Sequence, residues 1–237
     1  MDKIPGETQE LTTTEAFQQI LTRAEIPVTV PDDIESLCCG QPWSSKGFPD
    51  AYKSMAERTT RSLFRASRMG KIPIVVDTTP CTYSLLHYEH ILEDETLAQW
   101  MHLNIIDLTE YLQKTVLPKL HLQKIPGTVV CHPTCSTMKM ELTGLLESVA
   151  AQCAEKVVIP REHSCCGFAG DRGLLQPELT ASATRTESAE VAGLHNVQGY
   201  YSTSRTCEVG MSHATGHPYS SIIHLVERAS CPTEIHG

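Results

Sequence analysis

Two adjacent cysteines followed by glycine occur twice in the sequence, as LCCG at residues 37–40 and SCCG at 164–167. Neighbouring side chains point to opposite faces of a strand and sit about 100° apart around a helix, so neither element aims both at one point. A glycine directly after them permits a left-handed or otherwise strained backbone. We therefore interpret each CCG stretch as a turn that directs two sulfurs toward a common centre.

The segments that follow the two CCG stretches share one order, which indicates a duplicated unit. After each comes a helical pattern ended by glycine, then a short apolar strand pattern, then a single cysteine, Cys81 or Cys207. The separations are nearly equal, 81 − 39 = 42 and 207 − 166 = 41 residues. We place the first repeat at residues 1–120 and the second at 121–237, with the boundary in the proline-flanked stretch 118–127.

Strand and helix patterns alternate along both halves. Short apolar runs predict strands at 26–30, 72–77, 104–108, 127–131, 156–160 and 199–204. Helical patterns lie between them, and Ser136 and Asp171 are candidate helix caps. Strands of this kind separated by helices are typical of parallel sheets covered by helices. The predicted fold class is α/β, with two pseudo-symmetric repeats.

The composition excludes some functions and favours others. A formal net charge of −9 argues against nucleic acid as the main partner, because phosphate binding requires a basic surface. The sequence shows neither a secretory signal nor an apolar run long enough for a membrane span, so we expect a cytoplasmic protein. Thiols stay reduced there, and ten cysteines in 237 residues then indicate metal or redox chemistry rather than a disulfide framework.

Four cysteines of the second repeat follow predicted strands of a parallel sheet, where loops converge on one crevice. They are Cys135, Cys165, Cys166 and Cys207. Four thiolates suit either a tetrahedral zinc ion or an iron–sulfur cluster. The sequence has no pair of CxxC knuckles, and an adjacent cysteine pair is better explained by two metal atoms or cluster sulfurs held from one turn. This spacing favours an iron–sulfur cluster over mononuclear zinc.

The first repeat offers only Cys38, Cys39 and Cys81, with no cysteine upstream to match Cys135. These three thiols fit a cluster with a ligand other than cysteine, or small buried side chains that only pack. Among the remaining cysteines, we expect Cys131 and Cys153 in the core and Cys231 at the surface. Four histidines lie near the second-repeat cysteines, and we expect them to donate hydrogen bonds to sulfur rather than to ligate. They are His132, His163, His213 and His217.

The ordered set of motifs resembles the cysteine-rich CCG-domain proteins. This family includes iron–sulfur subunits of heterodisulfide reductase, glycolate oxidase and anaerobic glycerol-3-phosphate dehydrogenase, and a lactate-utilisation protein. The chain is still more similar to the C-terminal region of large FAD- and Fe–S-containing D-2-hydroxy-acid dehydrogenases, of the D-lactate and D-2-hydroxyglutarate types. The motifs that carry the resemblance, spread over residues 25–227, are LCCGQPWSSKGF, VDTTPC, CSTMKM, CCGFAGDRG with PELTASA, YSTSRTCEVGMS and GHPYSSI.

The resemblance implies electron transfer beside a flavin. It implies that the four second-repeat cysteines are ligands of a cluster, expected to be 4Fe–4S, with the three first-repeat cysteines as their equivalents. Heterodisulfide-reductase members end each repeat in CxxC, whereas Ser204 and Thr78 stand three residues before Cys207 and Cys81 here, so disulfide cleavage is not expected. The FAD domain and ferredoxin motifs of the large dehydrogenases are also missing. The chain thus looks like their C-terminal piece, with FAD expected on a partner chain or domain.

Three hypotheses follow. The first is an iron–sulfur electron-transfer module that acts with an FAD-containing dehydrogenase of small D-2-hydroxy acids and has no substrate site of its own. The second is a structural or docking module in which the thiols hold zinc or nothing. The third is a thiol–disulfide sensor, which is disfavoured because no Lys/Arg cluster lies near the cysteines to lower a thiol pKa.

Overall fold

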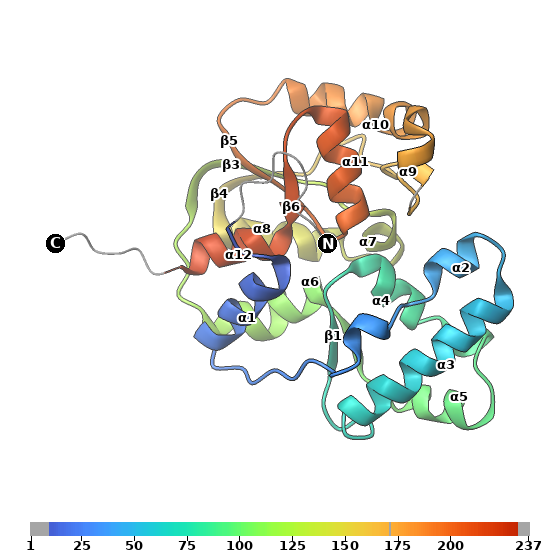
Figure 1. Cartoon of the computed structure of the whole chain (residues 1–237). Helices are drawn as coiled ribbons and strands as arrows, with labels where there is room; N and C mark the ends of the chain where they lie inside the picture. The colour runs from blue at the N-terminus through green and yellow to red at the C-terminus, as the bar shows by residue number, and fades with distance from the viewer. Residues whose placement is uncertain (1–9, 171, 232–237) are drawn as a thin grey trace. The chain divides into compact units, whose positions relative to one another are not determined.

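The computed structural model describes residues 10–170 and 172–231 (Figure 1). The chain divides into two compact units. The larger unit comprises Met1–Pro27 and Leu112–Gly237, and the smaller unit is Val28–Tyr111. The larger unit therefore holds the four second-repeat cysteines together with the N-terminal segment, and the smaller unit holds the three first-repeat cysteines. The repeat boundary at 120/121 remains a prediction.

The larger unit is built on a parallel four-stranded sheet with the strand order β4-β3-β5-β6. Its strands are β3 (Ile125–Cys131), β4 (Ala154–Val158), β5 (Val197–Ser202) and β6 (Tyr219–Ser221). The central strand β3 is fully buried at Val129, Val130 and Cys131, as expected for a parallel strand covered on both faces.

Helices cover both faces of this sheet. Helices α8 and α12 pack on it with α1 against α12, and α10 and α11 pair with each other on the opposite side (Figure 1). A capping box between Thr12 and Glu15 starts α1. The helical elements are α1 (Thr13–Arg23), a π-helix (Leu112–Val116), a 3-10 helix (Leu117–Lys119), α7 (Cys135–Lys139), α8 (Thr143–Cys153), α9 (Arg172–Leu175), α10 (Pro177–Ala192), α11 (Arg205–Thr215) and α12 (Ile222–Ser230).

The smaller unit has two parallel strands, β1 (Ile74–Val76) and β2 (Ile105–Asp107). Its core contains Ala56 and Leu63 of the long helix α3, packed with Leu85, Tyr88 and Leu92. The helical elements are α2 (Gln41–Ser45), α3 (Pro49–Ala66), α4 (Thr79–Leu85), α5 (Asp94–Met101) and α6 (Leu108–Tyr111), with 3-10 turns at Ile34–Ser36 and Tyr88–His90. Both units thus confirm the predicted α/β class with parallel sheets flanked by helices.

The two repeats share one path through their units. In each, a CCG turn leads to a long helix that starts with proline, α3 or α10, and then to a strand and a helix with a single cysteine. Strands β1 and β2 thereby correspond to β5 and β6. Among the described residues, the smaller unit has no counterpart of β3 or β4. The first repeat therefore keeps half of the sheet.

Two local predictions were wrong. Residues 26–30 form no strand, because Pro27 and Pro31 lack the N–H that a sheet ladder requires. Val28 and Val30 in this segment are exposed (53% and 44%). The predicted N-cap Ser136 lies inside α7, whose N-cap is Thr134. Helix α7 ends at Lys139, and Glu141, with a positive φ of 58°, separates it from α8. The other candidate cap, Asp171, lies outside the described residues.

Candidate metal centre

The four second-repeat cysteines all follow the carboxyl ends of adjacent parallel strands. Cys135 is the first residue of α7, after β3, and Cys165 and Cys166 lie in the loop after β4. Cys207 lies in the first turn of α11, after β5. The strand order β4-β3-β5 makes these three strands neighbours, so their loops meet at one edge of the sheet.

Glycine shapes the turn that carries Cys165 and Cys166. Gly167 has φ +69°, in the left-handed region, and its N–H lies 3.4 Å from Sγ of Cys165 as a hydrogen-bond donor. A Cβ at Gly167 would lie 2.8 Å from the carbonyl oxygen of Leu179 and 2.8 Å from Cβ of Ala183. The turn therefore needs glycine both for its backbone conformation and for its close approach to α10.

The sulfurs interact as thiol–thiolate pairs. Sγ of Cys166 donates to Sγ of Cys207 at 3.0 Å. This hydrogen bond lowers the pKa of Cys207 to about 6 against the opposing effect of burial, and the pKa of Cys166 is raised. Hydrogen bonding with Cys135, and then with Cys166, lowers the pKa of Cys165 to about 2, while the pKa of Cys135 is raised. Each pair thus combines a thiol whose pKa is lowered with one whose pKa is raised, and a metal would displace the protons that the thiols hold.

A buried histidine joins this set. Nδ1 of His132 lies 2.8 Å from a carboxylate oxygen of Glu187, and the two side chains are 0% and 2% exposed. Burial by itself lowers the pKa of His132, but the Cys207 and Glu187 side chains outweigh it and raise this pKa to about 9. The ligand atoms of His132, Cys166 and Cys207 lie within 4.8 Å of one another, and within the described residues they are the only such group of His, Cys, Asp and Glu.

The sequence did not point to Glu187 as a site residue. It lies on the buried stripe of α10 with Thr180, Thr184 and Val191. The sequence signal that could have identified Glu187 was an acidic residue at a buried position of the helix, because a carboxylate in the core requires a partner. Its partner is 55 residues away in sequence, and only the fold brings the two together.

The other predicted residues lie where expected or have partners other than the sulfurs. Cys131 and Cys153 are fully buried and Cys231 is exposed, as predicted. His217 stacks on Tyr200, with ring centroids 4.5 Å apart. His163 hydrogen-bonds through Nδ1 to the carbonyl of Pro160, and His213 is exposed on α11.

The smaller unit repeats the turn chemistry with three thiols. Gly40 has φ +74°, and its N–H lies 3.4 Å from Sγ of Cys38. Hydrogen bonding with Cys81 lowers the pKa of Cys39 to about 6 against the effect of burial, and the pKa of Cys81 is raised. Ser84 secures the turn by donating to the carbonyl oxygen of Cys39 at 2.9 Å. This thiol pair resembles Cys166 and Cys207, but no buried histidine accompanies it among the described residues.

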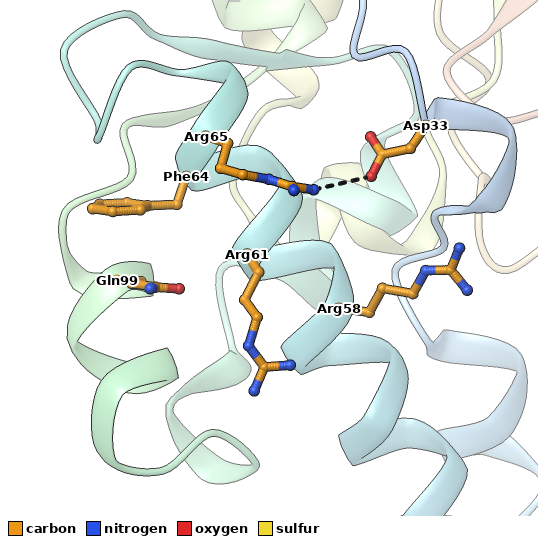
Figure 2. A pocket seen from close by; sticks show the side chains of 6 residues that line it. All are labelled: Asp33, Arg58, Arg61, Phe64, Arg65 and Gln99. Atoms are coloured by element: carbon orange, nitrogen blue, oxygen red, sulfur yellow. Dashed lines mark hydrogen bonds and ion pairs between the residues drawn. The ribbon is translucent and has the colours of Figure 1, made fainter.

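A separate pocket in the smaller unit is basic and has no thiol in its lining. Figure 2 shows its six lining side chains, in a cavity of about 390 Å³. Arg65 forms an ion pair with Asp33 at 3.4 Å, drawn as the dashed line in Figure 2. The lining residues are Asp33, Arg58, Arg61, Phe64, Arg65 and Gln99. Because none of them is a cysteine, this pocket is distinct from the thiol group of the same unit.

The CCG cysteine-rich domain model matches the chain twice, over residues 6–86 and 129–212. The matched ranges cover more than half of the chain. They contain the cysteine pairs of both CCG turns together with Cys81, Cys135 and Cys207. The chain belongs to the cysteine-rich CCG-domain family. The two matches confirm that the CCG domain occurs in tandem.

Curated relatives of this tandem CCG chain include two kinds of protein. Lactate utilization protein A of Macrococcus caseolyticus (strain JCSC5402) is 24% identical over 146 residues, which are 56% of this chain and 56% of that protein. A subunit of the anaerobic glycerol-3-phosphate dehydrogenase of Escherichia coli (strain K12) is 25% identical over 146 residues, which are 61% of this chain and 37% of that protein. Lactate utilization protein A of Oceanobacillus iheyensis is 23% identical over 183 residues, or 73% of this chain and 71% of that protein. The CCG chain therefore spans only about half and about a third of the first two relatives.

Proposed function

We propose that this CCG-domain chain is the iron–sulfur electron-transfer module of a dehydrogenase. The observation that carries the proposal is the convergence of four thiols, two of them with lowered pKa values, at the carboxyl ends of three adjacent strands. The relatives support it, because one is named as part of a dehydrogenase and another as a lactate utilization protein. A membrane-spanning helix is not found among the described residues.

The ligands in this proposal are Cys135, Cys165, Cys166 and Cys207. When bound, a 4Fe–4S cluster would accept and release single electrons. The chain's own contribution is to hold the four thiolates and to shield Cys166 and Cys207 from water, while Cys165 is exposed. An apolar cluster of Phe168, Met211 and Tyr219 packs with Cys166 and Cys207, with Tyr200 and Val209 against it. Burial, hydrogen bonds and net charge at the sulfurs are the properties that set a cluster potential.

The partner is proposed to be an FAD-containing dehydrogenase chain or domain in the cytoplasm. Electrons would pass from its flavin through the cluster toward an acceptor, and small D-2-hydroxy acids of the D-lactate or D-2-hydroxyglutarate type would be oxidised at the flavin. The names of the relatives add glycerol-3-phosphate as a second substrate to test. Cys38, Cys39 and Cys81 are the proposed ligands of a second, incomplete site.

A second candidate function is a zinc-holding docking module. The observation that favours it is the buried group of His132, Cys166 and Cys207, because Cys₃His is one of the donor sets of structural zinc sites. In that case the protein would be colourless and the metal would stabilise a surface for the dehydrogenase partner.

Metal analysis separates the two candidates. Iron, zinc and acid-labile sulfide are measured per chain after anaerobic purification, together with the visible spectrum. About four irons with matching sulfide are expected for one tetranuclear cluster, and about eight if the first repeat also binds one. Zinc alone, or no metal after reconstitution, would refute the electron-transfer proposal.

Two cysteine variants test the ligand assignment. Cys166→Ser is expected to lose iron while its far-ultraviolet circular dichroism is unchanged, because the substitution removes a thiolate and little volume. Cys231→Ser is the matched control, since that cysteine is exposed and lies at the end of α12. An iron content equal to wild type in Cys166→Ser would show that Cys166 is not a ligand.

A further inference from the structure

The imidazole of His132 is held at one nitrogen and open at the other. Its Nδ1 contacts the carboxylate of Glu187 at 2.8 Å, and its Nε2 is buried and makes no well-aligned hydrogen bond within the described residues, although Cys207 lies close enough to raise the pKa of the ring. A polar atom without a well-aligned partner is rare in a protein core, so a buried imidazole nitrogen in that position indicates a missing partner.

The atoms that surround this open nitrogen are soft metal donors. A ring nitrogen of His132 and the sulfurs of Cys166 and Cys207 lie within 4.8 Å of one another, and Nε2 is the ring nitrogen that Glu187 does not occupy. All three side chains are buried (0%, 3% and 5% exposed), so bulk water does not readily satisfy the nitrogen. A metal ion bound by both sulfurs would lie within reach of it.

The pairing of His132 with the carboxylate of Glu187 is an arrangement that is common around histidines that bind metals. A histidine that binds a metal commonly donates its other ring N–H to a carboxylate, which fixes the tautomer and raises the basicity of the ligating nitrogen. Glu187 is placed to accept this bond from Nδ1 at 2.8 Å. Once Nε2 loses its proton, the ring, still protonated at Nδ1, presents a lone pair on Nε2.

We propose that His132 is a ligand of the metal centre through Nε2, with Glu187 as the carboxylate that orients it. For His132, this proposal differs from the expectation that the histidines near the cysteines donate hydrogen bonds to sulfur. With His132, Cys166 and Cys207 as ligands, one position is left for Cys135 or Cys165, both on a single tetrahedral ion and on a 4Fe–4S cluster with one protein ligand per iron. His132 would then replace one of these two cysteines in the ligand set proposed above. On binding, the thiols and any protonated Nε2 release their protons to solvent, and no oxidant or reductant is required.

The inference rests on the proposed metal centre but not on its being an iron–sulfur cluster. A direct test therefore uses a spectroscopic ion in place of iron. The full chain, labelled with ¹⁵N-histidine, is freed of metal and titrated anaerobically with ¹¹³Cd²⁺, a thiolate-seeking spin-½ ion. A one-bond ¹¹³Cd–¹⁵N coupling at an Nε2 atom is expected, together with an Nδ1–H proton on the same ring.

His132→Asn assigns the coupled ring, and the coupling is expected to disappear in it. His213→Gln is the matched control, because His213 is exposed on α11 and its loss should leave the coupling unchanged. If His132→Asn fails to fold, Glu187→Gln provides the assignment. It keeps an oxygen that can accept from Nδ1, so the coupling should persist while the Nδ1–H resonance of that ring shifts.

The carboxylate has its own readout. Glu187→Ala is expected to weaken Cd²⁺ binding by about 10–100-fold, as for other partners of metal-bound histidines. Glu190→Ala, on the same helix, should leave the affinity unchanged, because that carboxylate accepts a hydrogen bond from the backbone N–H of Arg161.

Three results would overturn the inference: bound cadmium with no nitrogen coupling, coupling to a different histidine, or no cadmium binding at the thiols. The iron and sulfide analysis is independent of these outcomes. Iron with sulfide but no nitrogen coupling would refute the histidine ligand alone. Nitrogen coupling in a chain that never takes up iron would refute the electron-transfer function and leave the ligand in place.

Discussion

Gly167→Ala tests the claim that the second CCG turn needs glycine for two separate reasons. Gly167 has φ +69°, and a Cβ there would meet the carbonyl oxygen of Leu179 and Cβ of Ala183, each at 2.8 Å. Gly170 lies three residues on with φ +75°, yet a Cβ there would have nothing within 4 Å. The two alanine variants therefore share the conformational cost and differ in the steric one.

The expected free-energy changes follow from these distances. A residue with a Cβ in the left-handed region costs roughly 1–2 kcal/mol, partly offset by about 0.4–1 kcal/mol because alanine restricts the unfolded chain. Gly170→Ala should therefore lower the free energy of unfolding by about 0–1.5 kcal/mol. Overpacking adds about 1–3 kcal/mol to Gly167→Ala, because its clash includes backbone of α10 that cannot rotate away.

Urea unfolding of the metal-free chain, followed by circular dichroism, measures both variants. Metal titration should show a second difference, because a displaced turn moves Cys165 and Cys166 but Gly170 lies beyond them. Gly167→Ala is expected to bind cadmium more weakly than Gly170→Ala. Equal destabilisation of the two variants, with equal cadmium affinity, would refute the close approach between this turn and α10.

Three further predictions use other parts of the larger unit. Leu146→Ala should lower the free energy of unfolding by about 2–5 kcal/mol, because the side chain is fully buried, whereas the exposed Leu174→Ala should change it by less than about 0.5 kcal/mol; similar urea midpoints would contradict this. Thr134→Ala should cost about 0.5–2 kcal/mol and weaken metal binding, because Thr134 caps α7, which starts at Cys135; an unchanged metal affinity would separate the cap from the site. Cys165 should react with iodoacetamide at a nearly constant rate from pH 8 to pH 5 in the metal-free chain. Its pKa is lowered to about 2, so the thiolate persists on acidification, whereas a free thiol of pKa about 8.5 slows about tenfold per pH unit; a tenfold fall at Cys165, measured by mass spectrometry, would refute the shift.

The sequence predicted those parts of the site that depend on local patterns. A glycine after two cysteines indicates a left-handed turn, and Gly40 and Gly167 both adopt positive φ values. The strand predicted at 26–30 was wrong, because β-branched residues also occur in exposed loops between prolines. Strand order and long-range side-chain contacts could not be predicted from the sequence. Neither the strand order β4-β3-β5-β6 nor the contact between His132 and Glu187 leaves a local pattern in the sequence.

The difference between the two repeats follows from the sheet rather than from single substitutions. In the larger unit, β3 ends at Cys131, and the five residues from there to Cys135 include both a thiol at the start of α7 and the buried imidazole of His132. The smaller unit has no counterpart of β3 among the described residues, so a thiol and an imidazole are lost there together. The CCG turn and the single cysteine on a helix share a proton between the thiols of Cys39 and Cys81. They offer only three sulfurs, however, to a metal that needs four donors. A cysteine added to the smaller unit would therefore also need a strand to position it, as β3 positions Cys135 in the larger unit.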